Sequence, residues 1–329
     1  MKILIAGFGS IGRRHFHNLL ALGERDIIFY RTGQSTLNDA ELDGFTIEPN
    51  LEAALAHQPE AVIVANPTAL HLSVAIPAAE AGCSLLLEKP ISDSLAGLDD
   101  LRSALQRGGG RVLVGFQYRY HPGLERVARL LQENALGRPL SVRVHWGEYL
   151  PGWHPWEDYR RGYSARKDLG GGVVLTLSHP LDYLRWLFGE ISALWAFTGF
   201  RSELELEVED TAEIGLRFSN GVLGSVHLNY NQRPPRHDLE IVGSGGTLRW
   251  DNADGAAKVY RAAGPGTWET YSLPEGFERD WLFRAQLAHF LEVAAGQAEP
   301  RCTLTDGIRA LELALAAHIS SDQAKLQKF

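Results

Sequence analysis

The sequence predicts an α/β protein: a doubly wound parallel sheet at the N-terminus, followed by an α+β domain with an open, mainly antiparallel sheet. Three observations predict this. The first ~115 residues alternate short apolar runs with segments of helical spacing, as buried parallel strands and crossover helices do. The later runs are longer and alternate apolar with polar residues, as half-exposed antiparallel strands do. The chain has 329 residues, more than one hydrophobic core usually holds.

The element pattern follows the chain in that order. In the first part, strands are expected at 2–6, 26–30, 61–65, 84–88 and 111–115, and helices at 11–22, 51–57, 69–81 and 95–106. A helix at 124–132 then leads to strands at 140–148, 211–218, 222–230 and 238–242, and the chain ends in helices at 283–295 and 306–318. We place the domain boundary near 117–122, which gives domains 1–118 and 119–329, with the last helices free to pack back on the first domain.

Two glycine-containing segments of the second part predict hairpin turns. Ser219-Asn220-Gly221 lies between two strand patterns, and asparagine and glycine tolerate positive φ. The glycines at 243–246 also follow a strand, but another strand pattern comes directly after them. The segment therefore favours a second hairpin rather than a phosphate-binding loop.

Composition excludes several classes of function. The formal net charge is −8, so no global basic field attracts nucleic acid or an anionic membrane. No apolar run reaches the roughly 18 residues of a membrane span, and the apolar run at the N-terminus is too short for a signal peptide. Cys83 and Cys302 are too few for a disulfide framework and indicate reduced thiols. We expect a cytoplasmic protein.

A glycine-rich loop follows the first strand and opens a helix. Gly7 permits a tight turn, Gly9 lets a pyrophosphate approach the backbone, and Gly12 lets the helix pack closely on the strand. Phosphates would then meet the free N–H groups at the helix N-terminus. The candidate cofactor contacts in this loop are Gly7, Phe8, Gly9, Ser10, Ile11 and Gly12.

The end of the second strand indicates which dinucleotide is bound. A carboxylate usually reads the ribose of NAD there, but this chain has Tyr30-Arg31-Thr32. Arg31 can form a charge-assisted fork with a 2′-phosphate, and Thr32 can add a hydroxyl. Arg31 could equally be a surface arginine stacked on adenine. The cofactor expected is NAD(P), with a preference for NADP.

Two further loops follow strands of the same predicted sheet. Asn66-Pro67-Thr68 begins the segment that ends at His71, and Glu88-Lys89-Pro90 follows the next strand. The carboxyl ends of strands in a doubly wound sheet face the ligand crevice, so these loops should converge beside the glycine loop. A lysine at a strand end can also be an ordinary surface charge.

Together these segments resemble the Gfo/Idh/MocA family of oxidoreductases, which includes glucose–fructose oxidoreductases and inositol dehydrogenases. The resemblance covers nearly the whole chain and rests on GFGSIGRRH (7–15), NPTALH (66–71), AGCSLLLEKP (81–90), GFQYRYHP (115–122), GGGVVLTLSHPLDYLRWLFG (170–189) and CTLTDG (302–307). It implies an NAD(P)-binding Rossmann domain and a second domain whose open sheet often mediates oligomers. We therefore expect a homo-oligomer, dimer or tetramer, acting on a small sugar-like molecule.

The resemblance also implies roles for single residues. Lys89 and His179 match the family's catalytic lysine and histidine, and either side chain can exchange a hydroxyl proton. Other matched positions imply cofactor contacts from Asn66, Pro67, Thr68, His71, Glu88, Lys89 and Gln117. His179 lies in an apolar helix pattern, so a structural histidine is the alternative interpretation.

One position departs from the family pattern. Members commonly carry an aspartate shortly before the histidine, whereas Leu175 and Thr176 occupy those positions here. Thr176 can hydrogen-bond a substrate hydroxyl but cannot relay a proton at neutral pH. Lys89 and His179 must then carry the proton transfer without an aspartate, or a water molecule must take part in it. Asp182 matches a further family position, for which helix packing is the expected role and orientation of a histidine is the alternative.

An aromatic and basic segment precedes the triple glycine at 170–172. Aromatic faces suit sugar rings or nicotinamide, and arginine forks suit carboxylates and phosphates. The cations of 151–167 therefore favour an acidic substrate, a sugar acid or a nucleotide-sugar; the alternative is an ordered connection packed by its own tryptophans. The candidate substrate contacts are Lys89, Arg119, Trp156, Tyr159, Tyr163, Arg166, Thr176 and His179.

Other chemistries find less support. His15 and His17 are two residues apart on a helix pattern and face different ways, so no metal site is expected. Two alternatives to the sugar dehydrogenase remain open. One is a catalytically silent protein that senses NAD(P) or a ligand. The other is a reductase of a non-sugar, such as an imine or a tetrapyrrole.

Overall fold

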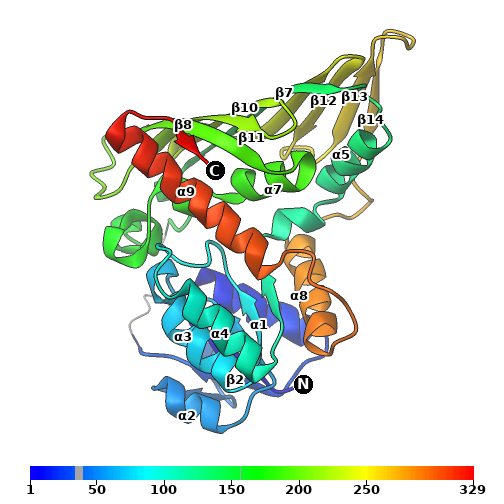
Figure 1. Ribbon diagram of the computed structural model, residues 1–329. Helices are drawn as coiled ribbons and strands as arrows, with labels where there is room; N and C mark the ends of the chain where they lie inside the picture. Colours follow the sequence, from blue (N-terminus) through cyan, green and yellow to red (C-terminus); the bar gives the residue numbers. More distant parts are fainter. Residues whose placement is uncertain (34–39, 156) are drawn as a thin grey trace. The chain divides into compact units, whose positions relative to one another are not determined.

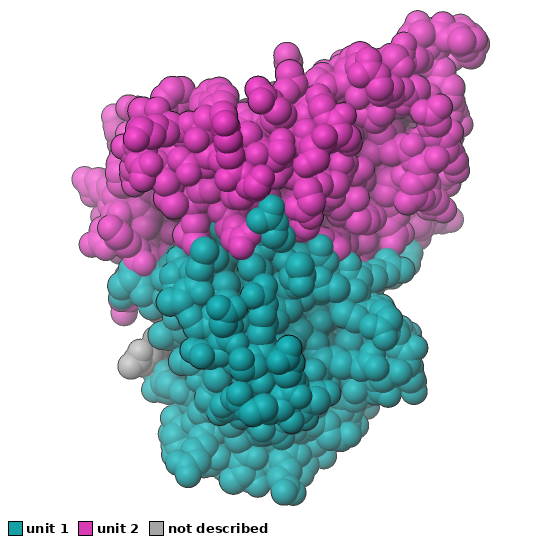
Figure 2. Space-filling view, in the orientation of Figure 1, with its two compact units in different colours: residues 1–117, 168–170, 278–311 teal, residues 118–167, 171–277, 312–329 magenta. Residues whose placement is uncertain are grey.

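The computed structural model describes residues 1–33, 40–155 and 157–329 and contains two compact units. The first unit comprises Met1–Gln117, Asp168–Gly170 and Glu278–Leu311. The second comprises Tyr118–Lys167, Gly171–Phe277 and Glu312–Phe329 (Figure 2). Each unit is built around its own sheet.

The first unit contains the predicted parallel sheet. Its order is β3-β2-β1-β4-β5-β6 and every neighbouring pair is parallel, which confirms the doubly wound arrangement. Strands β1, β4 and β5 are buried along their whole length, as their uninterrupted apolar runs predict. The strands are β1 (Ile3–Ala6), β2 (Ile27–Tyr30), β3 (Thr46–Glu48), β4 (Ala61–Val64), β5 (Ser84–Leu87) and β6 (Val112–Val114).

The helices of this unit follow the predicted positions, with two shifts. The helix expected from residue 95 begins at Leu98, because Gly97 has a φ of +81° that a right-handed helix does not allow. The helix expected from residue 69 starts with the short η2 (Thr68–Leu70). The helices are α1 (Ser10–Ala21), α2 (Leu51–Ala56), α3 (His71–Glu80), α4 (Leu98–Gly108) and α8 (Asp280–Ala294), with the short η1 at Ala40–Leu42.

Helix α8 comes from the end of the chain and packs on α1 within the first unit. Arg14 of α1 forms an ion pair with Asp280 at 3.2 Å, and its guanidinium lies 4.5 Å from the ring centre of Phe283. Helix α9 (Leu304–Gln323) follows; its residues up to Leu311 belong to the first unit and the rest to the second.

The second unit contains a nine-stranded sheet in the order β14-β13-β12-β11-β7-β10-β9-β8-β15. All neighbouring pairs are antiparallel except β7 and β10, so the sheet is mainly antiparallel, as predicted. The strands are β7 (Pro139–Tyr149), β8 (Ile191–Gly199), β9 (Thr211–Phe218), β10 (Leu223–Asn229), β11 (Asn231–Gly243), β12 (Gly246–Asp251), β13 (Ala257–Arg261), β14 (Trp268–Tyr271) and β15 (Gln327–Lys328).

Both predicted hairpin turns are present. Gly221 has a φ of +88° and donates its N–H to the carbonyl of Phe218 at 3.0 Å, which joins β9 to β10. The glycines at 243–246 join β11 to β12, so they form a hairpin and not a second phosphate loop. Strands β8, β13, β14 and β15 were not among the predicted elements.

One face of this sheet is covered by helices (Figure 1). Ser320 of α9 accepts the N–H of Ala196 in β8 at 2.9 Å. The other helices of the unit are α5 (Pro122–Gln132), α6 (Val173–Thr176) and α7 (His179–Phe188), with the short segments η3 (Gln117–Tyr120), η4 (Leu150–Gly152), η5 (Tyr159–Arg161), η6 (Tyr163–Ala165) and η7 (Lys167–Leu169) along the connections. Residue Gln117 of η3 and most of η7 are counted with the first unit.

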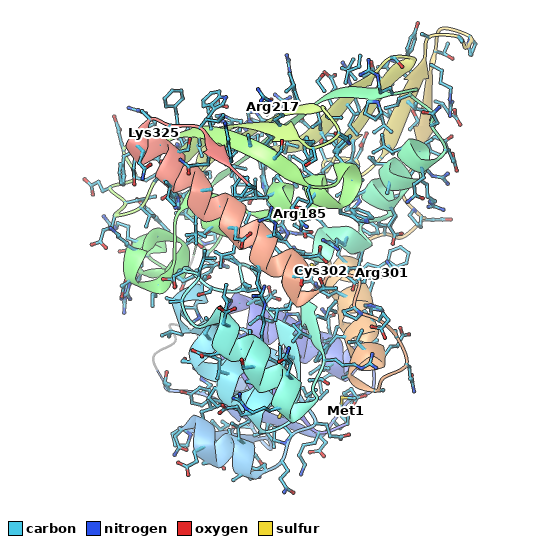
Figure 3. The ribbon with its side chains drawn as sticks, viewed as in Figure 1. Met1, Arg185, Arg217, Arg301, Cys302 and Lys325 are labelled. Atoms are coloured by element: carbon cyan, nitrogen blue, oxygen red, sulfur yellow. The ribbon has the colours of Figure 1, made fainter. Side chains whose placement is uncertain are left out.

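The opposite face of the sheet carries exposed side chains. Trp195 and Phe197 of β8 are 45% and 64% exposed, and Leu223 of β10 is 55% exposed. Arg217 of β9, labelled in Figure 3, alternates with buried neighbours and belongs to the same face. Across the described ranges, no helix combines the length and apolarity needed to cross a membrane.

Candidate active site

The glycine loop has the backbone geometry of a phosphate-binding turn. Gly7 has a φ of +95°, and a Cβ at this residue would lie 2.7 Å from the backbone nitrogen of Asn66. A Cβ at Gly12 would lie 2.1 Å from the carbonyl oxygen of Gly7. Both glycines are therefore required by the fold itself, because any side chain would collide with backbone atoms.

Gly9 differs from these two glycines. Apart from its chain neighbours, a Cβ at residue 9 would have no atom of the described residues within 4 Å, and its φ of −77° is open to any residue. Gly9 is the N-cap of α1 and supplies no side-chain bond to the first N–H groups of the helix. The protein thus leaves space and hydrogen-bond donors together at the positive end of α1, which fits a bound pyrophosphate.

The Phe8 side chain lies in the core rather than in the open space. It is 2% exposed and packs edge-on against Phe16 and Phe29. Two guanidinium groups lie over its ring, Arg13 at 5.0 Å and Arg31 at 5.6 Å. Burial lowers the pKa of Arg31, and the nearby charge of Arg13 lowers it further. Arg31, directly after β2, thus lies close to a second guanidinium group over the same ring.

The loop after β4 lies directly beside the glycine loop. The Nδ2 group of Asn66 donates to the carbonyl of Leu70 at 2.9 Å, and His71 Nε2 bonds the carbonyl of Asn66 at 2.9 Å. The Oδ1 atom of Asn66 is buried, and no hydrogen-bond partner for it lies among the described residues. A ribose or amide donor of a dinucleotide fits such an acceptor.

The loop after β5 places a buried carboxylate next to Lys89. Glu88 is 6% exposed; its Oε1 lies 2.7 Å from His15 Nε2, and its Oε2 accepts the backbone N–H of Lys89 at 3.3 Å. Burial lowers the pKa of His71, and the charge of Glu88 opposes that shift. His15 was not among the predicted site residues, because its partner is distant in the sequence.

The sheet therefore brings together the candidate residues of the first unit. The loops that carry them follow β1, β2, β4, β5 and β6, which are all parallel, so they share the carboxyl edge of the sheet. These residues are Gly7 to Gly12, Arg31, Thr32, Asn66, Pro67, Thr68, His71, Glu88, Lys89 and Gln117.

His179 belongs to the second unit and begins α7. It is 3% exposed, with the ring of Tyr118 edge-on at 5.0 Å and that of Trp146 at 5.5 Å. A second histidine completes this cluster: His237 of β11 stacks on Trp146 at 4.1 Å. Its ring nitrogens lie 3.3 Å from the Tyr118 hydroxyl and 3.2 Å from that of Tyr183. Sequence reasoning missed His237, since no local pattern links it to His179.

Thr176 lies at the end of α6 and is 3% exposed. The hydroxyl of the buried Tyr230, which lies near Thr176, donates to the carbonyl of Ser164 at 3.4 Å. Burial raises the pKa of Tyr230 well above its usual value, and the nearby Thr176 side chain opposes that shift. A tyrosine that stays protonated thus occupies the neighbourhood of the position where the family pattern has a carboxylate.

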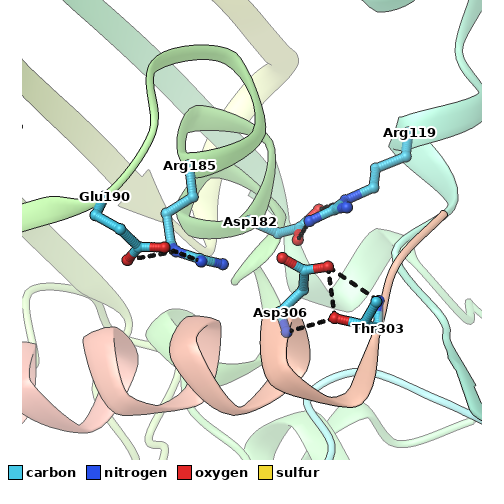
Figure 4. A network of polar contacts seen from close by, with 6 residues as sticks. All are labelled: Arg119, Asp182, Arg185, Glu190, Thr303 and Asp306. Atoms are coloured by element: carbon cyan, nitrogen blue, oxygen red, sulfur yellow. Dashed lines mark hydrogen bonds and ion pairs between the residues drawn. The ribbon is translucent and has the colours of Figure 1, made fainter. Parts of the chain in front are cut away.

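Arg119 forms a buried ion pair with Asp182 of α7 (Figure 4). Its Nε and one terminal nitrogen donate to the two carboxylate oxygens at 3.0 and 2.7 Å. This bidentate pair fastens η3 to α7 beside His179. Arg119 as a direct substrate contact stays a prediction, and Asp182 has a defined partner that the sequence did not reveal.

The aromatic and basic segment at 151–167, which we expect to contact the substrate, consists largely of short helical turns. Tyr159 donates its hydroxyl to the carbonyl of Leu204 at 3.0 Å. Arg160 pairs with Asp158 at 3.0 Å and with Glu205 at 3.5 Å, so one of the cations already faces two carboxylates. Tyr163 and Arg166 are half-buried in and just after η6, while Trp156 lies outside the described residues.

The described residues contain no group of three or more histidine, cysteine or acidic side chains able to hold a metal ion. Cys83 and Cys302 are both buried free thiols, and Cys302 is labelled in Figure 3.

Comparisons with known proteins agree with these features. A family model described as an oxidoreductase family with an NAD-binding Rossmann fold matches residues 1–116, and the GFO/IDH/MocA C-terminal domain model matches residues 124–249. D-apiose dehydrogenase of Paraburkholderia graminis is 27% identical, with 98% of this chain and 88% of that protein covered. Myo-inositol 2-dehydrogenase of Thermotoga maritima is 26% identical, with 100% and 98% covered.

A solved structure shows the same fold. The WlbA dehydrogenase from Bordetella pertussis, in complex with NADH and UDP-GlcNAcA, superposes with a TM-score of 0.82 at 23% identity. The superposition covers 100% of this chain and 98% of that one.

Proposed function

The chain belongs to the Gfo/Idh/MocA family of NAD-dependent oxidoreductases, and from this premise we propose that it acts on an acidic, sugar-like molecule with NADP(H). Hydride moves between the nicotinamide and a carbinol or carbonyl carbon of a sugar acid or nucleotide-sugar. One observation carries the proposal: a glycine loop with open space at Gly9 and the loop bearing Lys89 follow strands of one parallel sheet.

A bound nicotinamide would supply the hydride acceptor or donor, and the chain's own residues would transfer the proton. In our proposal, Lys89 and His179 take the hydroxyl proton during oxidation and return it during reduction. The Thr176 hydroxyl does not ionise at neutral pH, so in our proposal it orients a substrate hydroxyl rather than moving a proton.

The preference for NADP is supported by two arginines beside the glycine loop. Arg31 replaces the carboxylate expected at the end of β2, and the charge of Arg13 acts on it. A 2′-phosphate could form charge-assisted bonds with these guanidinium groups that a ribose hydroxyl could not match.

An acidic substrate is supported by the exposed cations Arg161 and Lys167 near Tyr163. Among the similar proteins, WlbA is described in complex with UDP-GlcNAcA, an acidic nucleotide-sugar, while apiose and inositol are neutral. Low salt should accentuate any preference for negative charge, because exposed charges are screened as salt increases.

The test is a turnover assay with paired substrates. D-glucuronate is compared with D-glucose, and UDP-GlcNAcA with UDP-GlcNAc, each with NADP⁺ and NAD⁺ at low salt; D-apiose and myo-inositol complete the panel. We expect the carboxylated member of each pair to react faster. Lys89→Met should lower kcat by about 10²–10⁴ with cofactor affinity within a few-fold of the parent. Equal rates with neutral sugars would contradict the acidic substrate.

A catalytically silent sensor is the second candidate, favoured by threonine at the position of the family aspartate. A sensor would bind NADPH stoichiometrically and turn over nothing in the panel. Turnover of an imine alone would instead support a reductase of non-sugars. Near-parental kcat in both Lys89→Met and His179→Ala would remove the catalytic assignment.

We also propose that the exposed face of the second sheet binds a second copy of the chain. Four large apolar side chains gather on and just after its strands: Trp195, Phe197, Phe200 and Leu223, each 45% to 64% exposed. Phe197→Glu should lower the molar mass measured by light scattering, while Leu140→Glu, a change at another exposed strand residue, should not. The free thiols support the cytoplasmic location that we propose.

A further inference from the structure

His15 makes an unusual buried contact in the first unit. It lies in the second turn of α1, is fully buried, and bonds Glu88 Oε1 at 2.7 Å. The second oxygen of Glu88 accepts the backbone N–H of Lys89 at 3.3 Å. A single carboxylate thus joins α1 to the residue on which the proposed chemistry depends.

The fold leaves little room for this carboxylate to move. A Cβ at Gly115 would lie 2.9 Å from Glu88 Oε2 and 3.0 Å from its carboxyl carbon, so glycine is what admits the group there. On the other side the charge of Glu88 acts on His71, whose Nε2 bonds the Asn66 carbonyl. The carboxylate lies among the strand-end loops rather than in solvent.

Packing alone does not account for this arrangement. Burying a carboxylate is costly unless it is hydrogen-bonded, and an apolar pair of the same volume would avoid that cost. His15 Nδ1 is also buried, and within the described ranges no hydrogen-bond partner for it is found. An apolar residue at this position would stabilise the fold more, so we infer that the histidine serves to bond Glu88.

We propose that His15 is a positioning residue for Lys89. Its Nε2–H holds Glu88, and Glu88 in turn holds the Lys89 backbone in the place that proton transfer requires. The inference rests on the proposed role of Lys89. It also links two functions, because the helix that begins at the glycine loop carries the residue that fixes the lysine.

The test compares three variants on the substrate of the panel that turns over. His15→Leu removes the donor, and His15→Gln keeps an N–H that can reach Glu88. His17→Leu is the matched control, since His17 lies on the same helix and its side chain is 56% exposed. We expect His15→Leu to lower kcat by about 10- to 100-fold, the loss of one bond to a charged group, with the Kd for NADPH within about threefold. His15→Gln should recover most of kcat, and His17→Leu should equal the parent.

A double-mutant cycle tests whether His15 acts through Glu88. Glu88→Gln should lower kcat, and adding His15→Leu to it should lower kcat no further. If the loss of kcat in the double variant equals the product of the two single losses, His15 acts by another route and the inference is overturned.

Amide hydrogen exchange gives a readout that needs no substrate. Peptides covering 86–92 should exchange faster in His15→Leu than in the parent, with NADPH bound or absent. Their exchange rate should be unchanged in His17→Leu. Unchanged exchange together with parental kcat in His15→Leu would refute the positioning role. Lys89→Met separates the two proposals: a large kcat loss in Lys89→Met with none in His15→Leu leaves the function standing and removes this inference.

Discussion

Replacing Gly9 with alanine should separate cofactor binding from folding. Beyond its chain neighbours, a methyl group at residue 9 meets none of the residues that the structure describes within 4 Å, and the φ of −77° suits an L-amino acid. Alanine is a poorer N-cap than glycine by roughly 1 kcal/mol, while the unfolded chain loses about 0.4–1 kcal/mol of conformational freedom in return. We therefore expect the free energy of unfolding of the cofactor-free protein to stay within about 1 kcal/mol of the parent.

The pyrophosphate should be displaced by the same methyl group. Moving a phosphate oxygen outward by ~2 Å takes it beyond the roughly 3.2 Å reach of an N–H···O bond. A hydrogen bond to a charged group contributes about 1.5–3 kcal/mol. Losing one such bond weakens NADPH binding about 10- to 150-fold, at 1.4 kcal/mol per factor of ten.

Two measurements check this prediction: fluorescence titration with NADPH, and urea unfolding of the cofactor-free variant. Gly12→Ala is the contrasting variant, because its Cβ would lie 2.1 Å from the Gly7 carbonyl and should destabilise the fold. Parental NADPH affinity in Gly9→Ala would show that the pyrophosphate does not occupy this space.

Three further predictions concern charge and pH. Arg31→Ala should lower the NADPH-to-NADH affinity ratio, and an unchanged ratio measured by titration would rule out its contact with the 2′-phosphate. Burial lowers the pKa of His121 to about 4, so the unfolded chain takes up the proton first and stability falls as pH drops from about 6.5 to 4, by up to ~3 kcal/mol. His121→Asn keeps an acceptor for the Gly123 N–H and should flatten that part of a urea-unfolding pH series; an unchanged slope would exclude His121. Burial alone would lower the pKa of His318, but its bond to Glu209 outweighs burial and raises that pKa. The stability that this ion pair adds is therefore fully present below about pH 6.5 and is lost as pH rises through the pKa of the folded state. Glu209→Gln should accordingly be more destabilising at pH 6 than at pH 9, measured by urea unfolding.

The sequence predicted the elements that local pattern determines. The buried strands of the first unit and both hairpin turns were correct, because apolar runs and glycine positions are local signals. Strand β3 was missed because it has three residues and pairs only at the sheet edge, leaving no apolar run to detect. The opposite environments of His15 and His17 followed from their spacing.

The polar contacts of the site could not be predicted in the same way. His15 and Glu88 are 73 residues apart, and Arg119 and Asp182 are 63 apart. Nothing local in either segment distinguishes such a pair from two solvated charges. Likewise, Tyr230, which follows β10, comes near Thr176 only in the folded sheet, so the sequence alone indicated that a carboxylate was missing but not which side chain lies beside the threonine.

The parallel pairing of β7 with β10 in an otherwise antiparallel sheet has a consequence for how the protein folds. Residue 141 pairs with residue 223, and the chain between them must complete its excursion before the centre of the sheet can close. That excursion contains α7 with His179, as well as β8 and β9. Contacts of such long sequence separation form late and slowly. We therefore expect the helix that bears His179 to acquire its protection from hydrogen exchange in the last phase of refolding, together with the middle of the sheet and after its hairpins.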